Sequence, residues 1–356
     1  MAVVIYAVFL LFGLFGVRPY IGTQTSNPLI YDMTVDYLTI CCVMSVGVVF
    51  YAIYEKLLQA TGHSLYSTIA QIGGAVTNII LDPVMIYGLL GCPALGAKGA
   101  AYATVIGQCV SWLLGWMFHL KVNKELSNRV CYFKPAAFII KDIYTIGLPA
   151  IIAQALMSVM TYGLNIILVT VSEAMVTAYG LYYKVQQFIL FAAFGLRDAI
   201  TPIVSYAYGM KNKQRIQEGI RYGLLYTLII MLVGTGILEL FAGPLSKVFG
   251  LSGETEMLCI SAMLIISVSF VFAGINIALQ GVFQALEGGL ESLAVSLCRQ
   301  LVFVLPVAFI FARIAQRSYG LTWTVWITFP IVEIATTVIA CFLLRRIRRK
   351  TGIADK

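Results

Sequence analysis

The chain alternates long apolar runs with short breaks that are charged or rich in turn residues. Each run is long enough for a helix that crosses a bilayer, which needs about 20 apolar residues. Strands of an outer-membrane barrel would instead alternate over about ten residues. We therefore expect an all-α polytopic membrane protein. The pattern predicts ten transmembrane helices, at residues 1–17, 37–60, 68–90, 96–120, 144–171, 178–208, 218–242, 257–285, 291–314 and 320–344.

The breaks between these helices also predict the domain organisation. Residues 1–120 form a bundle of four helices, and residues 144–344 form a bundle of six. Residues 121–143 form a basic linker between them, and residues 345–356 form a basic tail. The first run has no basic region before it and no small-residue cleavage site, so we do not interpret it as a signal peptide.

Composition supports the membrane assignment and excludes a large soluble catalytic domain. Of 356 residues, 60% are hydrophobic and 11% are charged, and the mean hydropathy is +0.90. The net charge of +8 would suggest nucleic acid in a soluble domain. In a membrane protein, cytosolic anchoring near lipid explains it better, so we expect no nucleic-acid partner.

The distribution of Lys and Arg predicts the orientation of the chain. Sixteen of the 24 basic residues fall in alternate loops and in the tail, and five fall on the opposite side. The side with more basic residues is the cytosolic one. We therefore expect a multi-pass protein of the cell membrane with both ends of this chain in the cytosol. The sixteen are Lys56, Lys121, Lys124, Arg129, Lys134, Lys141, Lys211, Lys213, Arg215, Arg221, Arg345, Arg346, Arg348, Arg349, Lys350 and Lys356.

The remaining chemistry is sparse. The eight cysteines lie mostly in apolar runs without CxxC spacing, so we expect small buried hydrophobes. His63 and His119 stand alone, which indicates surface or interface histidines and no metal site. The chain has no GxxxxGK[ST] phosphate loop and no Ser/His/Asp arrangement. We expect no enzyme activity and no cofactor, so energy must come from an ion gradient or from none.

The sequence repeats itself at a separation of about 225 residues. Pro19 aligns with Pro244, and Gln59-Ala60 aligns with Gln284-Ala285. The matches pair helices that are six apart, so both copies cross the membrane in the same direction. Helices 144–171 and 178–208 have no partner in this register. The repeat therefore predicts about 80 further residues, folded as two helices, before Met1.

Several stretches resemble the multidrug and toxic compound extrusion (MATE) transporters. Residues 56–88, KLLQATGHSLYSTIAQIGGAVTNIILDPVMIYG, and then LGAKGAAYATVIGQ are similar to their fourth to sixth helices. YGLYYKVQQFILFAAFGLRDAITPIVSYAYG is similar to the eighth helix. GVFQALEGGLESLAVSLCRQLVFVLPVAFIF and VWITFPIVEI are similar to helices ten to twelve. The resemblance implies two six-helix bundles around a central cavity that export organic cations or drugs in exchange for Na⁺ or H⁺.

The chain also departs from the family pattern. Members usually have two small amides where this chain has Arg197-Asp198, and a glycine where Glu287 stands. Many place a coupling carboxylate in a first helix that this chain does not contain. The resemblance therefore does not identify the coupling ion. We expect a monomer whose partners are a drug, a coupling cation and membrane lipid.

Charged residues within the apolar runs are the candidates for ion coupling, because a charge in hydrocarbon is costly. Arg197, Asp198, Arg299 and Glu333 fall at similar depth in the second bundle, and Lys184 lies further out. One hypothesis is a carboxylate cluster with Arg299 and Arg197 as switching partners. The alternative is a static Arg299–Glu333 ion pair, with Arg197 reaching the interface.

Polar and aromatic residues are candidates for a substrate path. Asn165, Gln186 and Gln187 could bind a substrate or cross-link helices. Tyr183 belongs to an aromatic group that could stack on a flat cation or form an interfacial belt. Near the other end of the chain, Asp82-Pro83 is expected to end a helix.

Two other functions remain open. The first is a flippase for lipid-linked sugars, which would need a strongly cationic cavity for pyrophosphate. The second is an inactive transporter fragment.

Overall fold

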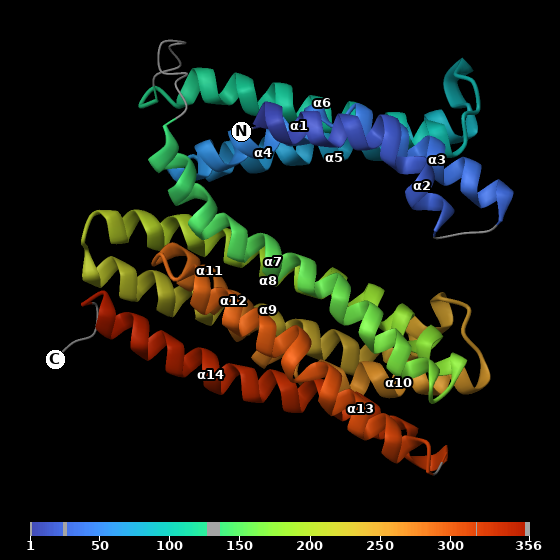
Figure 1. Ribbon diagram of the computed structural model, residues 1–356. Helices are drawn as coiled ribbons and strands as arrows, with labels where there is room; N and C mark the ends of the chain where they lie inside the picture. Colours follow the sequence, from blue (N-terminus) through green and yellow to red (C-terminus); the bar gives the residue numbers. More distant parts are fainter. Residues whose placement is uncertain (1, 24–26, 127–135, 318, 353–356) are drawn as a thin grey trace. The chain divides into compact units, whose positions relative to one another are not determined.

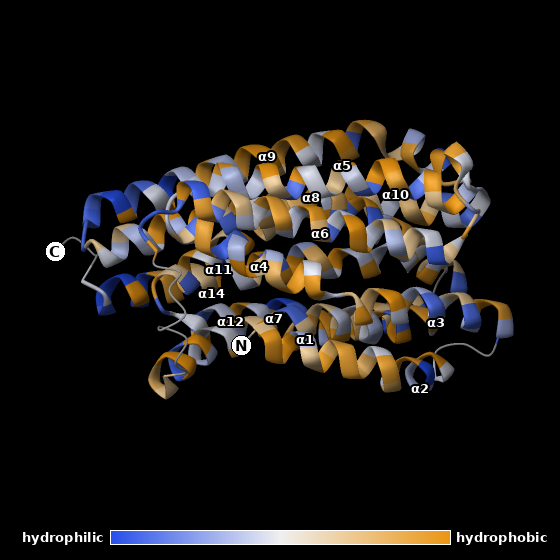
Figure 2. Ribbon diagram, turned by 90° about the horizontal axis from the view of Figure 1, so that it is seen from above, coloured by the Kyte–Doolittle hydropathy of each residue, from blue (hydrophilic) through white to orange (hydrophobic). Residues whose placement is uncertain are grey.

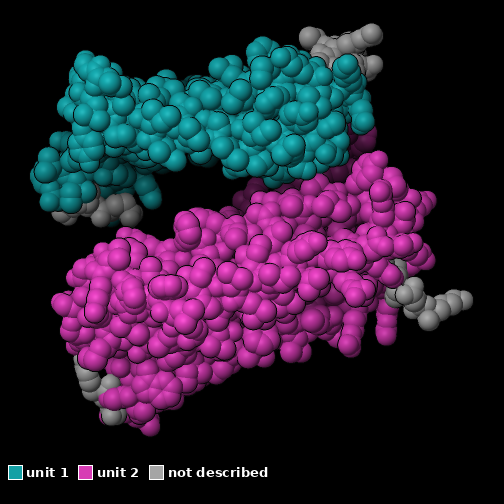
Figure 3. All heavy atoms as spheres, turned by 180° about the vertical axis from the view of Figure 1, so that it is seen from behind, with its two compact units in different colours: residues 1–133 teal, residues 134–356 magenta. Residues whose placement is uncertain are grey.

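The computed structural model describes residues 2–23, 27–126, 136–317 and 319–352 (Figure 1). Arg129, Lys134 and Lys356, named above, and Cys131, one of the eight cysteines, lie outside these residues. The chain divides into two compact units, residues 1–133 and 134–356 (Figure 3).

The first unit contains six α-helices and two short turns of other helix types within its described residues. They are α1 (Ala2–Leu11), the π-helical turn η1 (Phe12–Gly16), α2 (Val17–Gly22), α3 (Pro28–Val43), α4 (Val46–Ala60), α5 (Ser64–Tyr87), the 3-10 turn η2 (Leu89–Gly91) and α6 (Ala97–Val122).

The second unit begins at α7, inside the segment that the sequence predicts to be a linker, and α14 continues into the predicted tail. Its elements are α7 (Ala137–Val169), α8 (Glu173–Gly209), α9 (Lys213–Val248), α10 (Gly253–Ser267), α11 (Phe270–Ala285), α12 (Gly289–Leu297), the π-helical turn η4 (Cys298–Val302), α13 (Val304–Ala315), the 3-10 segment η5 (Tyr319–Ile327) and α14 (Thr328–Lys350).

The prediction of an all-α protein with about ten membrane spans is confirmed. Eight helices of the described chain are long and apolar enough to cross a membrane, and each of two bent helix pairs can supply one more span. The pairs are α3–α4, bent by 47°, and α10–α11, bent by 56°. The two bent pairs are partners in the predicted sequence repeat. The breaks, at Met44-Ser45 and Val268-Ser269, also lie at equivalent positions in it.

Side-chain capping explains where several helices begin. Asn27 accepts a hydrogen bond from the Leu29 amide and precedes Pro28, the first residue of α3. The Asn212 side chain accepts a hydrogen bond from the Arg215 amide at the start of α9. Each cap satisfies an amide that has no acceptor within its own helix.

Close helix packing in the first unit depends on glycines. A Cβ at Gly107 would lie 2.7 Å from the Gly74 carbonyl oxygen and 3.0 Å from the Asn78 Cβ. The backbones of α5 and α6 can approach this closely only without side chains at the crossing point.

Three local expectations from the sequence are wrong. Pro83 does not end α5, which continues to Tyr87, because a proline is tolerated inside a transmembrane helix where other groups satisfy the freed backbone atoms. His119 is buried beside the Tyr54 ring, so of the two expected positions, surface or interface, the surface position is wrong. Among the described cysteines, Cys92 and Cys341 are exposed, whereas the sequence predicts buried ones.

The outer surface of the helices is apolar, as lipid contact requires. Phe188 and Leu240 are 81% and 76% exposed, and many other large hydrophobic side chains are exposed as well. Figure 2 shows hydrophobic residues along most of the helices and hydrophilic residues gathered at the end of the second unit where the C-terminus lies. The α8–α9 turn lies at this same end (Figure 1). The chain is therefore a multi-pass membrane protein.

Candidate functional site

A buried ion pair joins α14, the last helix of the second unit, to the π-helical turn η4. Arg299 lies in η4, and its Nε donates to Oε1 of Glu333 in α14 at 2.6 Å. The two side chains are 11% and 10% exposed. Asn276 in α11 completes the group, because its Nδ2 donates to Glu333 Oε2 at 2.8 Å and to the Glu333 carbonyl oxygen at 3.2 Å. Three helical segments thus meet at one carboxylate.

The local structure around Arg299 is unusual. Residues 298–302 form a π-helical turn between α12 and α13. Backbone hydrogen bonds in such a turn join residues five apart, whereas those of an α-helix join residues four apart. Arg299 and Gln300 both lie in this turn. Because π turns often occur at functional sites, this one favours a role for the segment beyond connecting two helices.

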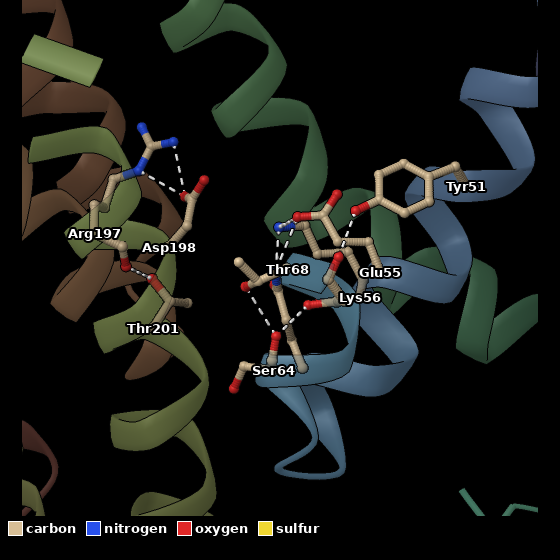
Figure 4. Close-up of polar contacts among 10 residues, drawn as sticks. Tyr51, Glu55, Lys56, Ser64, Thr68, Arg197, Asp198 and Thr201 are labelled. Carbon is tan, nitrogen blue, oxygen red and sulfur yellow. Dashed lines mark hydrogen bonds and ion pairs between the residues drawn. The ribbon is translucent and has the colours of Figure 1, made fainter. Parts of the chain in front are cut away.

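A second ion pair lies in α8. The Nε and Nη2 atoms of Arg197 both contact Asp198 Oδ1, at 3.1 and 3.0 Å (Figure 4). The Arg197 guanidinium also lies over the Phe194 ring, 5.1 Å from its centroid. Thr201 donates to the Arg197 carbonyl oxygen at 2.8 Å, as Figure 4 shows. The side chain of Asp198 is 45% exposed and that of Arg197 is 21% exposed.

The two arginines line one small pocket, although the two acids do not meet. No contact joins Asp198 to Glu333 among the residues that the structure describes. The pocket has a volume of about 310 Å³ and is bounded by α7, α8, α11, α12 and η4. We call it the guanidinium pocket. Its polar lining consists of Arg197, Arg299, Gln154, Gln280, Gln284, Gln300 and Ser296.

Three of the four substrate-path candidates line a larger groove. Asn165 in α7 and Tyr183 and Gln187 in α8 border a groove with a volume of about 1130 Å³. Gln187 Nε2 donates to the Tyr183 hydroxyl at 2.5 Å. Gln186 is buried and does not line the groove. The groove and the guanidinium pocket share lining residues, Arg197 and Phe194 among them, so the two spaces adjoin.

The aromatic residues of α8 separate into two groups. Tyr179 and Tyr182 are fully buried, and the Tyr179 ring stacks on Trp326 and Phe329 with interplanar angles of 14° and 17°. Tyr183, Phe191 and Phe194 are the α8 aromatic residues that line the groove. The buried tyrosines therefore belong to the core of the unit and do not contact a substrate in the groove.

A row of side-chain amides in α11 was not among the site residues predicted from the sequence. Asn276, Gln280 and Gln284 are spaced four apart, which places them on one face of α11. Gln280 and Gln284 line the guanidinium pocket, and Asn276 binds Glu333. The spacing of three amides in an otherwise apolar helix is a signal that the sequence contains.

The first unit contains polar contacts as well. Lys98 Nζ lies 3.1 Å from Asp36 Oδ2, and both residues line a pocket of about 450 Å³. In α5, Asn78 Nδ2 donates to Asp82 Oδ1 at 3.2 Å. Within the described residues, no three His, Cys, Asp or Glu side chains are grouped so that they could hold a metal ion.

Comparison with known proteins supports a transporter fold. The chain superposes on a MOP superfamily transporter from Pyrococcus furiosus with a TM-score of 0.88 and 23% identity, over 100% of this chain and 78% of that one. It superposes on a crystal structure of MATE in the straight conformation with a TM-score of 0.86 and 24% identity, over 99% of this chain and 79% of that one. The chain is therefore a polytopic α-helical membrane protein with the fold of these structures.

Sequence comparison finds one family model and a set of sequence relatives. The MatE family model matches residues 149–310. The multidrug export protein MepA of Staphylococcus haemolyticus strain JCSC1435 is 25% identical over 322 residues, which cover 90% of this chain and 69% of that protein. MepA of Staphylococcus aureus strain NCTC 8325 / PS 47 is 26% identical over 304 residues, which cover 83% and 63%. These matches support a MATE family transporter. The chain spans about two thirds of the length of these relatives.

Proposed function

We propose that this protein exports drugs, amphipathic organic cations among them, across the cell membrane by antiport with Na⁺ or H⁺. The names of the sequence relatives, which are multidrug export proteins, support the substrate class. Transport by a gradient fits a chain whose relatives are transporters and not enzymes.

The observation that carries the proposal is the Glu333 group. A carboxylate that is 10% exposed within an apolar helical unit is costly unless a cation or a proton neutralises it. Arg299 is that cation in the structure described here. A coupling ion that bound Glu333 would compete with Arg299 for the same oxygen atoms, so ion binding would release Arg299 from α14.

The groove supplies surfaces for the apolar part of a substrate. Tyr183, Phe191 and Phe194 line it, and aromatic faces attract organic cations. Its volume exceeds that of typical drug-binding pockets, about 300 to 1,000 Å³. A wide groove of this kind suits substrates of varied shape.

Transport by reconstituted protein tests the proposal. Proteoliposomes receive an imposed Na⁺ or H⁺ gradient, and the movement of a fluorescent organic cation is followed over time. We expect one of the two gradients to drive movement against the concentration gradient of the dye. Movement at the same rate with both gradients collapsed would contradict antiport.

A further inference from the structure

We propose that the guanidinium pocket binds the anionic group, a carboxylate or a phosphate, of an amphipathic ligand whose apolar body lies in the adjoining groove. This inference extends the substrate class of the proposed function. Its test below measures binding alone, so it can succeed or fail independently of transport.

The lining of the guanidinium pocket contains positive charges. The pocket is lined by two guanidiniums and four side-chain amides, and by no Asp or Glu among the described residues. Asp198 and Glu333 contact their arginines from outside the pocket. A ligand in the pocket therefore meets the positive groups first. This lining favours an anion.

Arg197 and Arg299 each have N–H donors without an acceptor among the described residues. An arginine has five N–H donors. Arg299 uses only Nε in a hydrogen bond with the described residues, and Arg197 uses Nε and Nη2. Both Nη groups of Arg299 and the Nη1 group of Arg197 therefore have no acceptor among the described residues. Paired N–H groups of a guanidinium match the two oxygens of a carboxylate or phosphate.

The lining of the pocket also contains two buried side-chain amides, each with an unpartnered atom within the described chain. Gln280 is 6% exposed and Gln300 is 7% exposed, and both line the pocket. Gln280 Nε2 and Gln300 Oε1 are buried and have no hydrogen-bond partner among the described residues. An unpaired buried polar atom costs about 1 to 3 kcal/mol. An oxyanion in the pocket would give the Gln280 amide an acceptor, and a protonated or hydroxyl-bearing ligand would give Gln300 a donor.

Close packing holds the guanidinium pocket in place. A Cβ at Gly281 would lie 2.7 Å from Arg197 Cγ and 3.1 Å from the Arg197 carbonyl oxygen, so α8 and α11 pack closely there. The Phe194 ring under the guanidinium limits its movement on the groove side. Arg197 is therefore directed toward the pocket before any ligand arrives, which lowers the entropy cost of binding.

The continuity with the groove indicates an amphipathic ligand and not an inorganic ion. Arg197, Phe194, Met157, Gln154 and Ile151 line both spaces. A ligand whose anionic group lies between the two arginines would extend its apolar body past Phe194 along α7 and α8. Two sources of such a ligand are a small organic anion and an anionic phospholipid.

Matched probes test the inference on protein purified in an uncharged detergent, by isothermal titration calorimetry. The probes are 2-naphthylacetate, the cation 2-(2-naphthyl)ethylammonium with the same ring system, inorganic phosphate, and dioctanoyl phosphatidic acid. We expect at least one amphipathic anion to bind at least about tenfold more tightly than the naphthyl cation, because charge-assisted hydrogen bonds are the strong ones. Tighter binding of naphthylacetate identifies a small organic anion, and tighter binding of phosphatidic acid identifies a lipid headgroup.

Single substitutions test whether the anionic ligand binds in the guanidinium pocket. Arg299→Gln should weaken anion binding at least about tenfold, since a charged donor is lost. Arg313→Gln, at an exposed arginine of α13 outside the pocket, should leave it unchanged. Gln280→Leu keeps both ion pairs and should weaken binding several-fold. If Arg299→Gln does not fold, Gln280→Leu alone decides. Equal anion and cation affinities, anion affinity no higher than that of inorganic phosphate, or no loss in the pocket variants would overturn the inference.

Discussion

Arg299 lines the guanidinium pocket while its Nε donates to Glu333, which does not line that pocket. The two partners of one ion pair therefore have different surroundings. The arginine adjoins a space that water or a ligand can enter. Among the described residues, the carboxylate accepts hydrogen bonds from Arg299 and Asn276. We therefore expect the loss of Arg299 and the loss of Glu333 to change the stability of the protein by different amounts.

We expect Arg299→Gln to destabilise the protein more than Glu333→Gln. Loss of one partner of a buried pair costs about 3 to 5 kcal/mol when the other charge is left unpaired. Glu333 would be left with one amide, whereas Arg299 would still face the pocket. Thermal unfolding midpoints in detergent measure this difference. The double variant Arg299→Gln/Glu333→Gln should recover much of the loss, and a double variant less stable than Arg299→Gln would contradict the argument.

We expect Glu333→Gln and Asp198→Asn to abolish efflux of a fluorescent organic cation while membrane expression stays near that of the parent protein. Each change removes a charge from the second unit and keeps the size of the side chain. Glu218→Gln is the matched control, because Glu218 is outside both pockets and binds only Gln214 within the described residues. Normal efflux by both acid variants would mean that the two ion pairs are structural.

We expect Glu287→Gly to stabilise the protein by about 1 kcal/mol. Glu287 has a φ of 62°, a left-handed conformation that costs an ordinary residue about 1 to 2 kcal/mol and glycine almost nothing. Glu291→Gly is the control, because Glu291 lies in the first turn of α12, where a glycine destabilises. Thermal unfolding should move in opposite directions for the two variants, and a shift in the same direction would be inconsistent with strain at Glu287.

We expect Gly107→Ala to destabilise the first unit by at least about 1 kcal/mol, since overpacked sites cost about 1 to 3 kcal/mol. The added methyl group would meet backbone atoms of α5, which cannot rotate away. Gly236→Ala in α9 has open space around it, so it should leave stability unchanged or raise it. Equal stability of the two variants would argue against the close α5–α6 crossing.

We expect the α8–α9 turn to face the cytosol, because most of the basic residues fall in that set of loops. Lys213 and Lys247 are exposed residues at opposite ends of α9. A membrane-impermeant maleimide should label Lys247→Cys in intact cells and Lys213→Cys only after permeabilisation, each compared with the parent chain. The reverse pattern would invert the topology.

The spans of this fold could be predicted from the sequence, whereas the breaks within them could not. Burial in lipid requires about 20 apolar residues, and this requirement is visible in every run. The bends at Met44-Ser45 and Val268-Ser269 interrupt runs that stay apolar throughout, so hydropathy contains no sign of them. Pro83 misled the prediction because proline ends helices in water more reliably than in a membrane.

Only part of the candidate site could be predicted from the sequence. The cost of charge in hydrocarbon pointed to Arg299 and Glu333, and depth along the helices placed them near each other. Depth does not give the direction of a side chain, so the separation of Asp198 from Glu333 was not predictable. Asn276 carries no charge and was not considered, although its amide makes two of the contacts that hold Glu333.

The central claim is that drug and cation move in opposite directions through one protein, with Glu333 as part of the exchange. The most direct test runs the exchange backwards. Proteoliposomes with no ion gradient receive an outward gradient of an organic cation, and the movement of Na⁺ or H⁺ is recorded with an ion-sensitive dye. The account predicts inward movement of one of these ions that stops in Glu333→Gln. Drug movement without any ion movement in the parent protein would contradict it.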